Sequence, residues 1–187
     1  KDLNGDGIID TNDRTMIGRG LPIHTGGFTN NFEYKGFDLS VFFQWSYGND
    51  VLNANRLFFD SGFQKKRELN QYASYTNRWT PENPNSDIPA ATNSSSNLVI
   101  SSRVVEDASF LRLKTVTLGY TVPKTFLKKY KIDNARLYVA AQNLWTITGY
   151  SGYDPEVSIR SGGLTPGLDF SSYPRALSVS FGINLGF

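Results

Sequence analysis

The most regular pattern of apolar and polar positions lies between residues 177 and 187. Large apolar side chains occupy every second position: Leu177, Val179, Phe181, Ile183, Leu185 and Phe187. The positions between them are small or polar: Ser178, Ser180, Gly182, Asn184 and Gly186. Successive side chains of a strand point to opposite faces, so the pattern predicts a strand with one apolar and one polar face. Soluble sheets and membrane barrels both use such strands, and the rest of the chain must distinguish them.

Two earlier segments repeat this alternation and predict a hairpin. Residues 28–34 and 37–47 are separated only by Lys35-Gly36, a strong signal for a tight turn. Aromatic side chains stand at both ends of the apolar face: Tyr34 and Phe37 near the turn, Trp45 and Tyr47 at the far end. Aromatic residues at both ends of an apolar band are typical of the two interfaces of a membrane.

Two more strands are predicted over residues 110–122 and 135–145. In the first of them Leu111 and Leu113 fall on the opposite parity from the later apolar positions Val116, Leu118 and Tyr120. This change of phase indicates either a β-bulge or the point at which the strand leaves the membrane.

The connections between the five predicted strands alternate in length. After the tight turn come a very long loop at 48–109, a moderate connection at 124–134 and another long loop at 146–174. Within the first loop, residues 51–69 carry a weak helical pattern. The moderate connection contains Lys124, Lys128, Lys129 and Lys131, which we interpret as a solvated turn. Short turns at one end and long loops at the other are typical of outer-membrane barrels.

The predicted fold class is therefore all-β, with five antiparallel strands that contribute to a larger transmembrane β-barrel. Single-chain bacterial barrels need at least about eight strands, and open sheet edges in lipid would leave backbone groups unpaired. Five strands must then pair with the remainder of the same barrel. Because the chain begins in an acidic loop without a signal peptide, we also expect it to be a piece of a longer polypeptide.

Composition narrows the possible functions only slightly. The 187 residues carry a formal net charge of +2, and basic residues are scattered, which argues against nucleic-acid binding. Cysteine is absent, so the chain has neither disulfides nor thiolate metal sites.

A calcium-type acidic loop occupies residues 2–13. Its ligand positions would be filled by Asp2, Asn4, Asp6, the carbonyl of Ile8, Asp10 and Asp13. Gly7 stands at the sixth position, where the sharp turn of such a loop requires glycine. The spacing predicts a bound Ca²⁺, although Asp13 is shorter than the usual glutamate at the last position. The alternative is a solvated acidic loop.

No catalytic constellation is evident, and we expect that the protein is not an enzyme. The sole histidine, His24, has no partner nearby in the sequence, and Asp154-Pro155-Glu156 is the kind of acidic pair that is common in loops.

Several ordered stretches together resemble the SusC/RagA family of TonB-dependent outer-membrane transporters. They include the acidic loop and the runs Tyr34-Lys35-Gly36-Phe37-Asp38-Leu39-Ser40, Arg78-Trp79-Thr80-Pro81-Glu82-Asn83-Pro84, and Glu106-Asp107-Ala108-Ser109-Phe110-Leu111-Arg112-Leu113-Lys114. Further matches are Leu118-Gly119-Tyr120 with Pro123, Gln142-Asn143-Leu144, Thr148-Gly149-Tyr150-Ser151-Gly152-Tyr153-Asp154-Pro155-Glu156, and Tyr173-Pro174-Arg175. The resemblance covers nearly the whole chain in order, which makes it far more specific than any single motif.

The resemblance implies that residues 1–187 are the C-terminal segment of a plugged barrel of about 22 strands with long extracellular loops. It implies import of oligosaccharides, or peptides in some members, across the cell outer membrane of Gram-negative Bacteroidetes. The implied partners are a SusD-like surface lipoprotein and the TonB–ExbB–ExbD complex, the latter acting through regions absent here.

Aromatic side chains in the two long loops are candidate contacts for the substrate or the lipoprotein lid, because aromatic faces stack on sugars. These are Trp79, Tyr150 and Tyr153. The alternative for each is that it packs the loops together. For the whole chain, two other interpretations stay open: a soluble calcium- or carbohydrate-binding β-sandwich, and an adhesion or structural barrel without transport.

Overall fold

The computed structural model describes residues 2–8, 10–62, 70–92, 98–159 and 166–187. The chain forms two compact units, each of which is described by itself. The sheet unit comprises residues 22–48, 108–157 and 173–187, and the loop unit comprises residues 1–21, 49–107 and 158–172.

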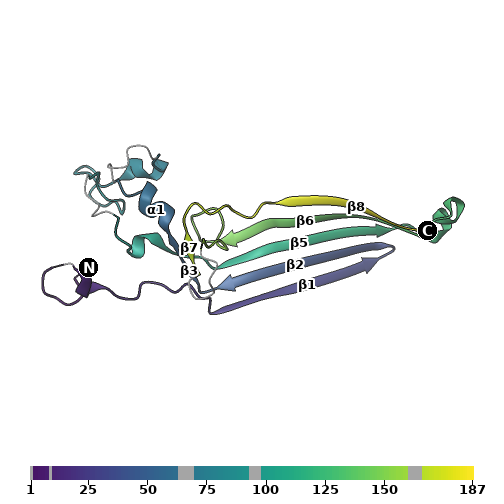
Figure 1. Ribbon diagram of the computed structural model, residues 1–187, viewed down its shortest axis with the longest axis horizontal. Coiled ribbons are helices and arrows are strands. Elements are labelled where there is room, and N and C mark those ends of the chain that lie inside the picture. Colours follow the sequence, from purple (N-terminus) through teal and green to yellow (C-terminus); the bar gives the residue numbers. More distant parts are fainter. Residues whose placement is uncertain (1, 9, 63–69, 93–97, 160–165) are drawn as a thin grey trace. The chain divides into compact units, whose positions relative to one another are not determined.

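The sheet unit is built on one five-stranded antiparallel sheet in the order β1-β2-β5-β6-β8 (Figure 1). Its strands are β1 (His24–Tyr34), β2 (Phe37–Tyr47), β5 (Phe110–Thr121), β6 (Asn134–Thr148) and β8 (Ser178–Gly186). Neighbours in the sheet follow one another along the chain, so the strands run up and down as a meander. The five predicted strands are confirmed, and β1 and β8 form the two edges of the sheet.

One face of this sheet carries a continuous band of large apolar side chains. The register aligns Phe37 of β2 with Tyr120, Leu39 with Leu118 and Val41 with Val116 of β5, and it continues through β6 to β8. Many of these side chains are exposed: Phe181 keeps 81% of its surface accessible and Ile183 keeps 65%. Exposed contiguous apolar surface of this extent marks contact with a membrane or with another protein surface.

The opposite face is mostly polar, as the alternation predicts, although Phe42 and Tyr138 also lie on it. It carries Ser40, Gln44, Thr115, Thr117, Ser178, Ser180 and Asn184, among others. Within the described residues the sheet unit holds no second sheet. A β-sandwich, the alternative fold, would need a second sheet packed against the apolar face to bury it.

A β-bulge resolves the change of phase in β5. Leu113 pairs with Phe43 and Thr115 pairs with Phe42, so Lys114 is an extra residue with no counterpart on β2. The extra residue returns Leu111 and Leu113 to the apolar face. Opposite it on β6, Asn143 adopts a left-handed conformation with φ of 53°, which asparagine tolerates better than most residues.

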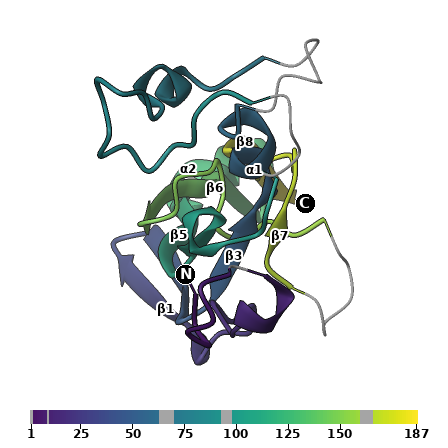
Figure 2. The same cartoon turned by 90° about the vertical axis from the view of Figure 1, so that its left-hand side faces the viewer.

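The loop unit contains strands where the sequence predicted loop with one weak helical segment. A second, three-stranded sheet has the order β4-β3-β7, with β3 (Asp50–Asn53), β4 (Val105–Asp107) and β7 (Leu168–Asp169). β3 pairs with β7 in parallel, and Figure 2 shows these two strands beside α1 (Ala54–Phe59). The weak helical signal is thus confirmed for six residues, and residues 63–69 lie outside the described part of the chain.

Short helical segments complete both units. The loop unit has the 3-10 turns η1 (Thr11–Asp13), η2 (Ala73–Asn77) and η4 (Ser102–Val104). The moderate connection of the sheet unit folds into α2 (Lys124–Leu127) and η5 (Lys128–Tyr130). Among the residues that the structure describes, no helix is both long enough and apolar enough to cross a bilayer.

Candidate functional site

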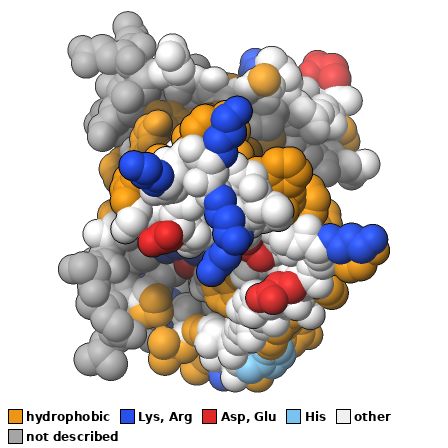
Figure 3. Space-filling view, turned by 90° about the vertical axis from the view of Figure 1, so that its right-hand side faces the viewer, with side chains coloured by type: hydrophobic (Ala, Val, Ile, Leu, Met, Phe, Trp, Pro, Cys, Tyr) orange, Lys and Arg blue, Asp and Glu red, His pale blue; other side chains and the backbone are white. Residues whose placement is uncertain are grey.

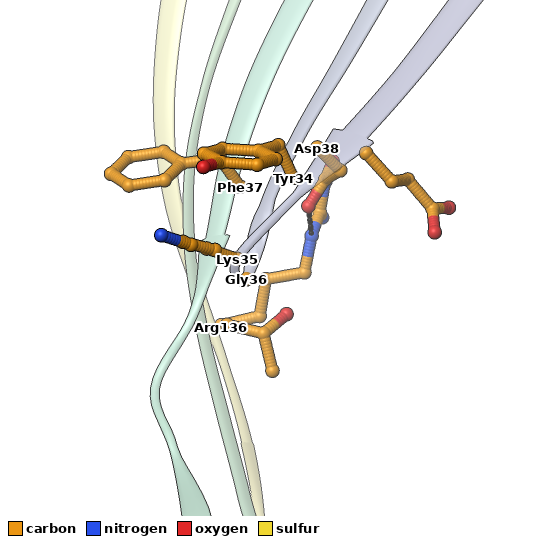
Figure 4. Close-up of a pocket in the computed structure, with 8 residues that line it drawn as sticks. Tyr34, Lys35, Gly36, Phe37, Asp38 and Arg136 are labelled. Carbon is orange, nitrogen blue, oxygen red and sulfur yellow. Dashed lines mark hydrogen bonds and ion pairs between the residues drawn. The ribbon is translucent and has the colours of Figure 1, made fainter.

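An ion pair crosses the polar face of the sheet near its tight turns. Arg136 of β6 donates from Nε to Oδ1 of Asp38 on β2 at 3.0 Å, and its Nη2 lies 2.5 Å from Oδ2. The two strands are not neighbours, because β5 lies between them. Gly119 of β5 makes the crossing possible, since a Cβ there would overlap both Arg136 Nη2 and Asp38 Oδ1. Figure 4 shows the Arg136 guanidinium reaching Asp38.

The same row continues to the edge strand β8. The guanidinium of Arg136 lies 5.3 Å from the centroid of the Tyr138 ring, within the range of a cation–π contact. The Tyr138 ring lies over Gly182, where a Cβ would overlap the ring carbon Cζ. Because Gly119 on β5 and Gly182 on β8 leave space on this face, a continuous row of side chains, Asp38, Arg136 and Tyr138, extends from β2 to β8.

A shallow pocket adjoins this row at the turn between β1 and β2. It is lined by Glu33, Tyr34, Lys35, Gly36, Phe37, Asp38, Thr121 and Arg136. Lys35 and Gly36 both have positive φ, at 47° and 84°, as a two-residue hairpin turn requires.

A second, more deeply buried charge cluster lies at the opposite end of β5. Arg112 Nη2 lies 2.5 Å from Oδ1 of Asp154, and Arg112 Nη1 lies 3.1 Å from Oε2 of Glu156. Lys114 Nζ approaches the same Glu156 oxygen at 3.3 Å, and Arg175 Nη2 lies 3.0 Å from Oε1. The side chains of Arg112 and Asp154 keep only 3% and 4% of their surface exposed. We call these five residues the Arg112 cluster.

Two backbone N–H groups also donate hydrogen bonds to the Asp154 carboxylate. Its Oδ1 accepts the N–H of Glu156 at 2.9 Å, and its Oδ2 accepts the N–H of Arg175 at 3.0 Å. Burial raises the pKa of Asp154, but the Arg112 hydrogen bond, these backbone donors and the Arg112 charge together lower it below its ordinary value. The carboxylate therefore stays ionised.

The Arg112 cluster fixes two chain segments to the sheet. Through Asp154 and Glu156 it holds the segment that follows β6, and through Arg175 the segment that precedes β8. Nε and Nη1 of Arg112 are buried without an aligned hydrogen bond to the described residues, so Nη1 interacts with Glu156 chiefly through charge. The acidic pair of residues 154–156 is thus fully engaged in ion pairs.

The acidic loop at residues 2–13 is closed by its own carboxylates. Asp2 accepts the N–H groups of Gly5 and Gly7 at 2.6 and 2.9 Å, and Asp13 accepts those of Leu3 and Asp10 at 2.7 and 2.8 Å. The Gly7 and Gly5 bonds lower the pKa of Asp2, and the Asp10 and Leu3 bonds lower the pKa of Asp13.

These bonds gather the predicted ligand residues around one short loop. Among the described residues, no three His, Cys, Asp or Glu side chains converge in a metal-binding arrangement. Each carboxylate oxygen has a second lone pair beyond the one facing the backbone, so the donor chemistry is compatible with a hard cation.

The three candidate aromatic contacts differ in exposure. Tyr153 is 87% exposed and Trp79 is 42% exposed, whereas Tyr150 is 6% exposed and packs over Gly152. For Tyr150, the structure favours the packing alternative. His24 is likewise engaged within the sheet unit, where its Nδ1 accepts the indole N–H of Trp45 at 3.1 Å.

Sequence reasoning did not single out the two ion-pair systems. Arg136 and Asp38 are 98 residues apart, and Arg112 and Asp154 are 42 apart, so no local spacing reveals them. The available signal is a charged residue at a polar-face position inside a strand, where it can pair with an opposite charge on another strand.

Comparisons with known proteins give consistent results. No family model matches the chain. The "TonB-dependent receptor P3" of Formosa agariphila is 40% identical over 191 residues, which cover 100% of this chain. The "TonB-dependent receptor SusC" of Bacteroides thetaiotaomicron is 29% identical and also covers 100% of it. Over its whole length the chain is therefore similar to one part of TonB-dependent receptors.

Solved structures agree with this similarity. The "RagAB peptide transporter" matches 87% of the chain with a TM-score of 0.73 and 33% identity. A "closed-closed" state of the RagAB peptide importer matches 89% with a TM-score of 0.75. The chain spans only 18% of the length of the curated Formosa receptor and 17% of the matched RagAB chain.

Proposed function

We propose that the protein forms part of the wall and the external loops of an outer-membrane transporter that imports nutrients with energy supplied through TonB. The observation that carries the proposal is the five-stranded sheet, which has an exposed apolar band on one face and a polar face behind it. Lipid contact accounts for the apolar band, and a polar lumen accounts for the other face. The two edge strands β1 and β8 would pair with further strands of the same barrel.

The proposed substrates are oligosaccharides or peptides. Peptide import rests on the likeness to the RagAB peptide transporter, and sugar import rests on exposed aromatic side chains. Of these, Trp79 and Tyr153 remain candidates for contact with the substrate or with a SusD-like lipoprotein on the cell surface. TonB–ExbB–ExbD would act through other parts of the full-length protein.

Uptake in living cells tests this function. A strain that lacks the full-length receptor should fail to take up its labelled oligosaccharide or peptide, and plasmid-borne receptor should restore uptake only when TonB is present. Uptake that persists without the receptor would support the alternative of a structural or adhesive barrel, and uptake through the receptor without TonB would contradict the proposed energy supply. Trp79→Ala and Tyr153→Ala should each reduce uptake severalfold, whereas Tyr173→Ala, which changes a comparably exposed tyrosine, serves as the control.

We also propose that the acidic loop binds one Ca²⁺ as a structural ion. Asp2, Asn4, Asp6, Asp10 and Asp13 would supply side-chain oxygens, and Ile8 its carbonyl, in the spacing of a calcium loop. Support comes from the sequence of the loop, which combines four aspartates and one asparagine at ligand positions with a glycine at the sixth position, the oxygen-rich pattern that Ca²⁺ prefers.

Calorimetric titration of the metal-free full-length receptor with Ca²⁺ tests the ion. One site is expected in the wild type, and Asp6→Asn, which removes one charge without changing the shape of the side chain, should weaken it at least about tenfold. Thr11→Ala, which changes an exposed side chain outside the ligand positions, is the matched control. Equal heats in wild type and Asp6→Asn would contradict the proposal.

A further inference from the structure

The connection between β5 and β6 presents a surface that the transport function does not use. Residues 124–130 form one helical run, α2 followed directly by η5. Pro123 accepts the N–H of Phe126 at 3.0 Å, and Leu127 accepts that of Ile132 at 3.4 Å. The run is therefore held in a defined conformation, with Leu127 buried as its inward anchor.

Two large aromatic side chains point outward from this run. Phe126 is 70% exposed and Tyr130 is 67% exposed. They stand four residues apart, a spacing that places side chains on one face of a helix. A turn surrounded only by water gains nothing from exposing two such rings side by side, so the simple interpretation of a solvated turn is incomplete.

Lysine side chains surround the two rings. Residues 124–131 contain Lys124, Lys128, Lys129 and Lys131 and no acidic residue. All four are exposed, and none forms an ion pair with the described residues. Lys129 Nζ lies 6.0 Å from the centroid of the Tyr130 ring. Figure 3 looks onto the end of the sheet where α2 lies, and it shows Lys and Arg side chains, with a few Asp and Glu side chains between them, among hydrophobic ones.

This segment directly follows the aromatic end of the apolar face. The ring of Tyr120 on β5 contacts that of Phe37 in a tilted arrangement with centroids 4.6 Å apart, and Lys124 comes four residues later in the chain. Aromatic rings prefer the interface of a bilayer, and lysines extend from there toward the headgroups. A run that combines outward aromatics with only positive charge is suited to an anionic lipid surface.

We propose that residues 124–131 form an interfacial anchor that binds anionic phospholipid headgroups in the membrane leaflet at the tight-turn end of the barrel. Phe126 and Tyr130 enter the interface, and the four lysines contact lipid phosphates. The anchor rests on the proposed outer-membrane location of the chain. Beyond that location, it specifies the ligand, an anionic phospholipid, and the segment that binds it, residues 124–131.

Native mass spectrometry of the purified full-length receptor tests the anchor with defined lipids. The receptor in detergent is mixed with equal amounts of phosphatidylglycerol and phosphatidylcholine, and the bound lipids are counted. The wild type should retain phosphatidylglycerol preferentially. Because one lysine near an anionic surface contributes about fivefold in affinity, replacing all four by glutamine should reduce that preference by about tenfold or more.

Two further variants separate charge from structure. Replacing the four lysines by arginine should keep the preference, since the charge is unchanged. In receptor reconstituted with phosphatidylglycerol, a spin label at Thr125 should report interfacial depth, and the double variant Phe126→Ser/Tyr130→Ser should move it toward water.

Each remaining outcome has a definite meaning. Equal phosphatidylglycerol preference in the wild type and the glutamine variant would overturn the anchor, as would a label that is fully water-exposed in the wild type. A segment that binds a periplasmic protein instead of lipid would give both of these results. If the wild type failed to reach the outer membrane at all, the proposed function would fail rather than the anchor.

Discussion

At the scale of single residues, glycine controls which side chains can meet across the sheet. Gly119 has no side chain on the polar face, and this absence lets Arg136 pass over β5 to Asp38. Gly182 likewise provides the space that the Tyr138 ring occupies. These glycines are needed for close approach rather than for an unusual backbone conformation.

Gly119→Val should therefore break the Arg136–Asp38 pair. The added side chain would overlap the guanidinium of Arg136 and the carboxylate of Asp38, and we expect a loss of about 1 to 3 kcal/mol in the free energy of unfolding. Urea unfolding of the full-length receptor in detergent measures this loss. Thr117→Val, two positions along the same face of β5, is the control and should change stability little.

The Arg112 cluster allows a sharper test, because it can be broken from either side. Arg112→Met leaves the Asp154 carboxylate buried without its main partner, which should cost about 3 to 5 kcal/mol. Asp154→Asn alone should also destabilise, whereas the two changes together should cost less than their sum. Thermal unfolding of the four proteins gives the coupling free energy, and strict additivity would show that the pair is not coupled.

The same cluster predicts a pH dependence. The pKa of Asp154 is lowered in the folded state, so its contribution is present above its ordinary value of 3.8 and is lost as the pH falls from there through the lowered pKa. Proteolysis of the segment after β6 should increase over that acidic range in the wild type. In the Asp154→Asn variant, the rate of proteolysis should be the same at the upper and lower pH limits of this range. A wild-type rate that does not change with pH would argue against this role of Asp154.

At the scale of elements, the alternation of side chains was sufficient to predict the strands. All five were placed within a few residues of their observed bounds, because a sheet with one apolar face imposes a period of two on the sequence. The change of phase in β5 indicated a bulge as one of two explanations, and the register selects the bulge and places it at Lys114.

The loop unit could not be predicted in the same way. Its strands are two to four residues long, and the parallel partners β3 and β7 are separated by more than a hundred positions. Runs this short carry no periodic signal, and their pairing is decided by tertiary contacts. The Arg112 cluster was hidden for the same reason, since its carboxylates lie on a connection outside the strands.

The bulge gives a prediction for the element as a whole. Deleting Lys114 shifts one half of β5 by one residue, which turns either Leu111 and Leu113 or the later apolar residues toward the polar face. Assembly of the receptor in the outer membrane should be lost, as seen by the mobility of unheated protein on SDS gels. Lys114→Ala keeps the register and should assemble, so equal assembly of both variants would contradict the assigned bulge.

At the scale of the whole molecule, the decisive feature is which face of the sheet meets lipid. The apolar band, the polar face behind it, the aromatic rings near the tight turns and the similarity to TonB-dependent receptors are all consistent with a barrel wall. The Arg136 row and the Arg112 cluster both lie on the polar face or on connections beyond it, where charge is tolerated.

The most direct test places one lysine on each face of β8 in the full-length receptor. Phe181 is 81% exposed on the apolar face, and Ser180 is its neighbour on the polar face. Phe181→Lys should impair membrane assembly, because a lysine in the lipid costs about 2 to 4 kcal/mol near the bilayer centre, whereas Ser180→Lys should assemble normally. Outer-membrane assembly is measured by heat-dependent gel mobility. Equal assembly of both variants, or failure of Ser180→Lys alone, would contradict the assignment of the apolar face to lipid.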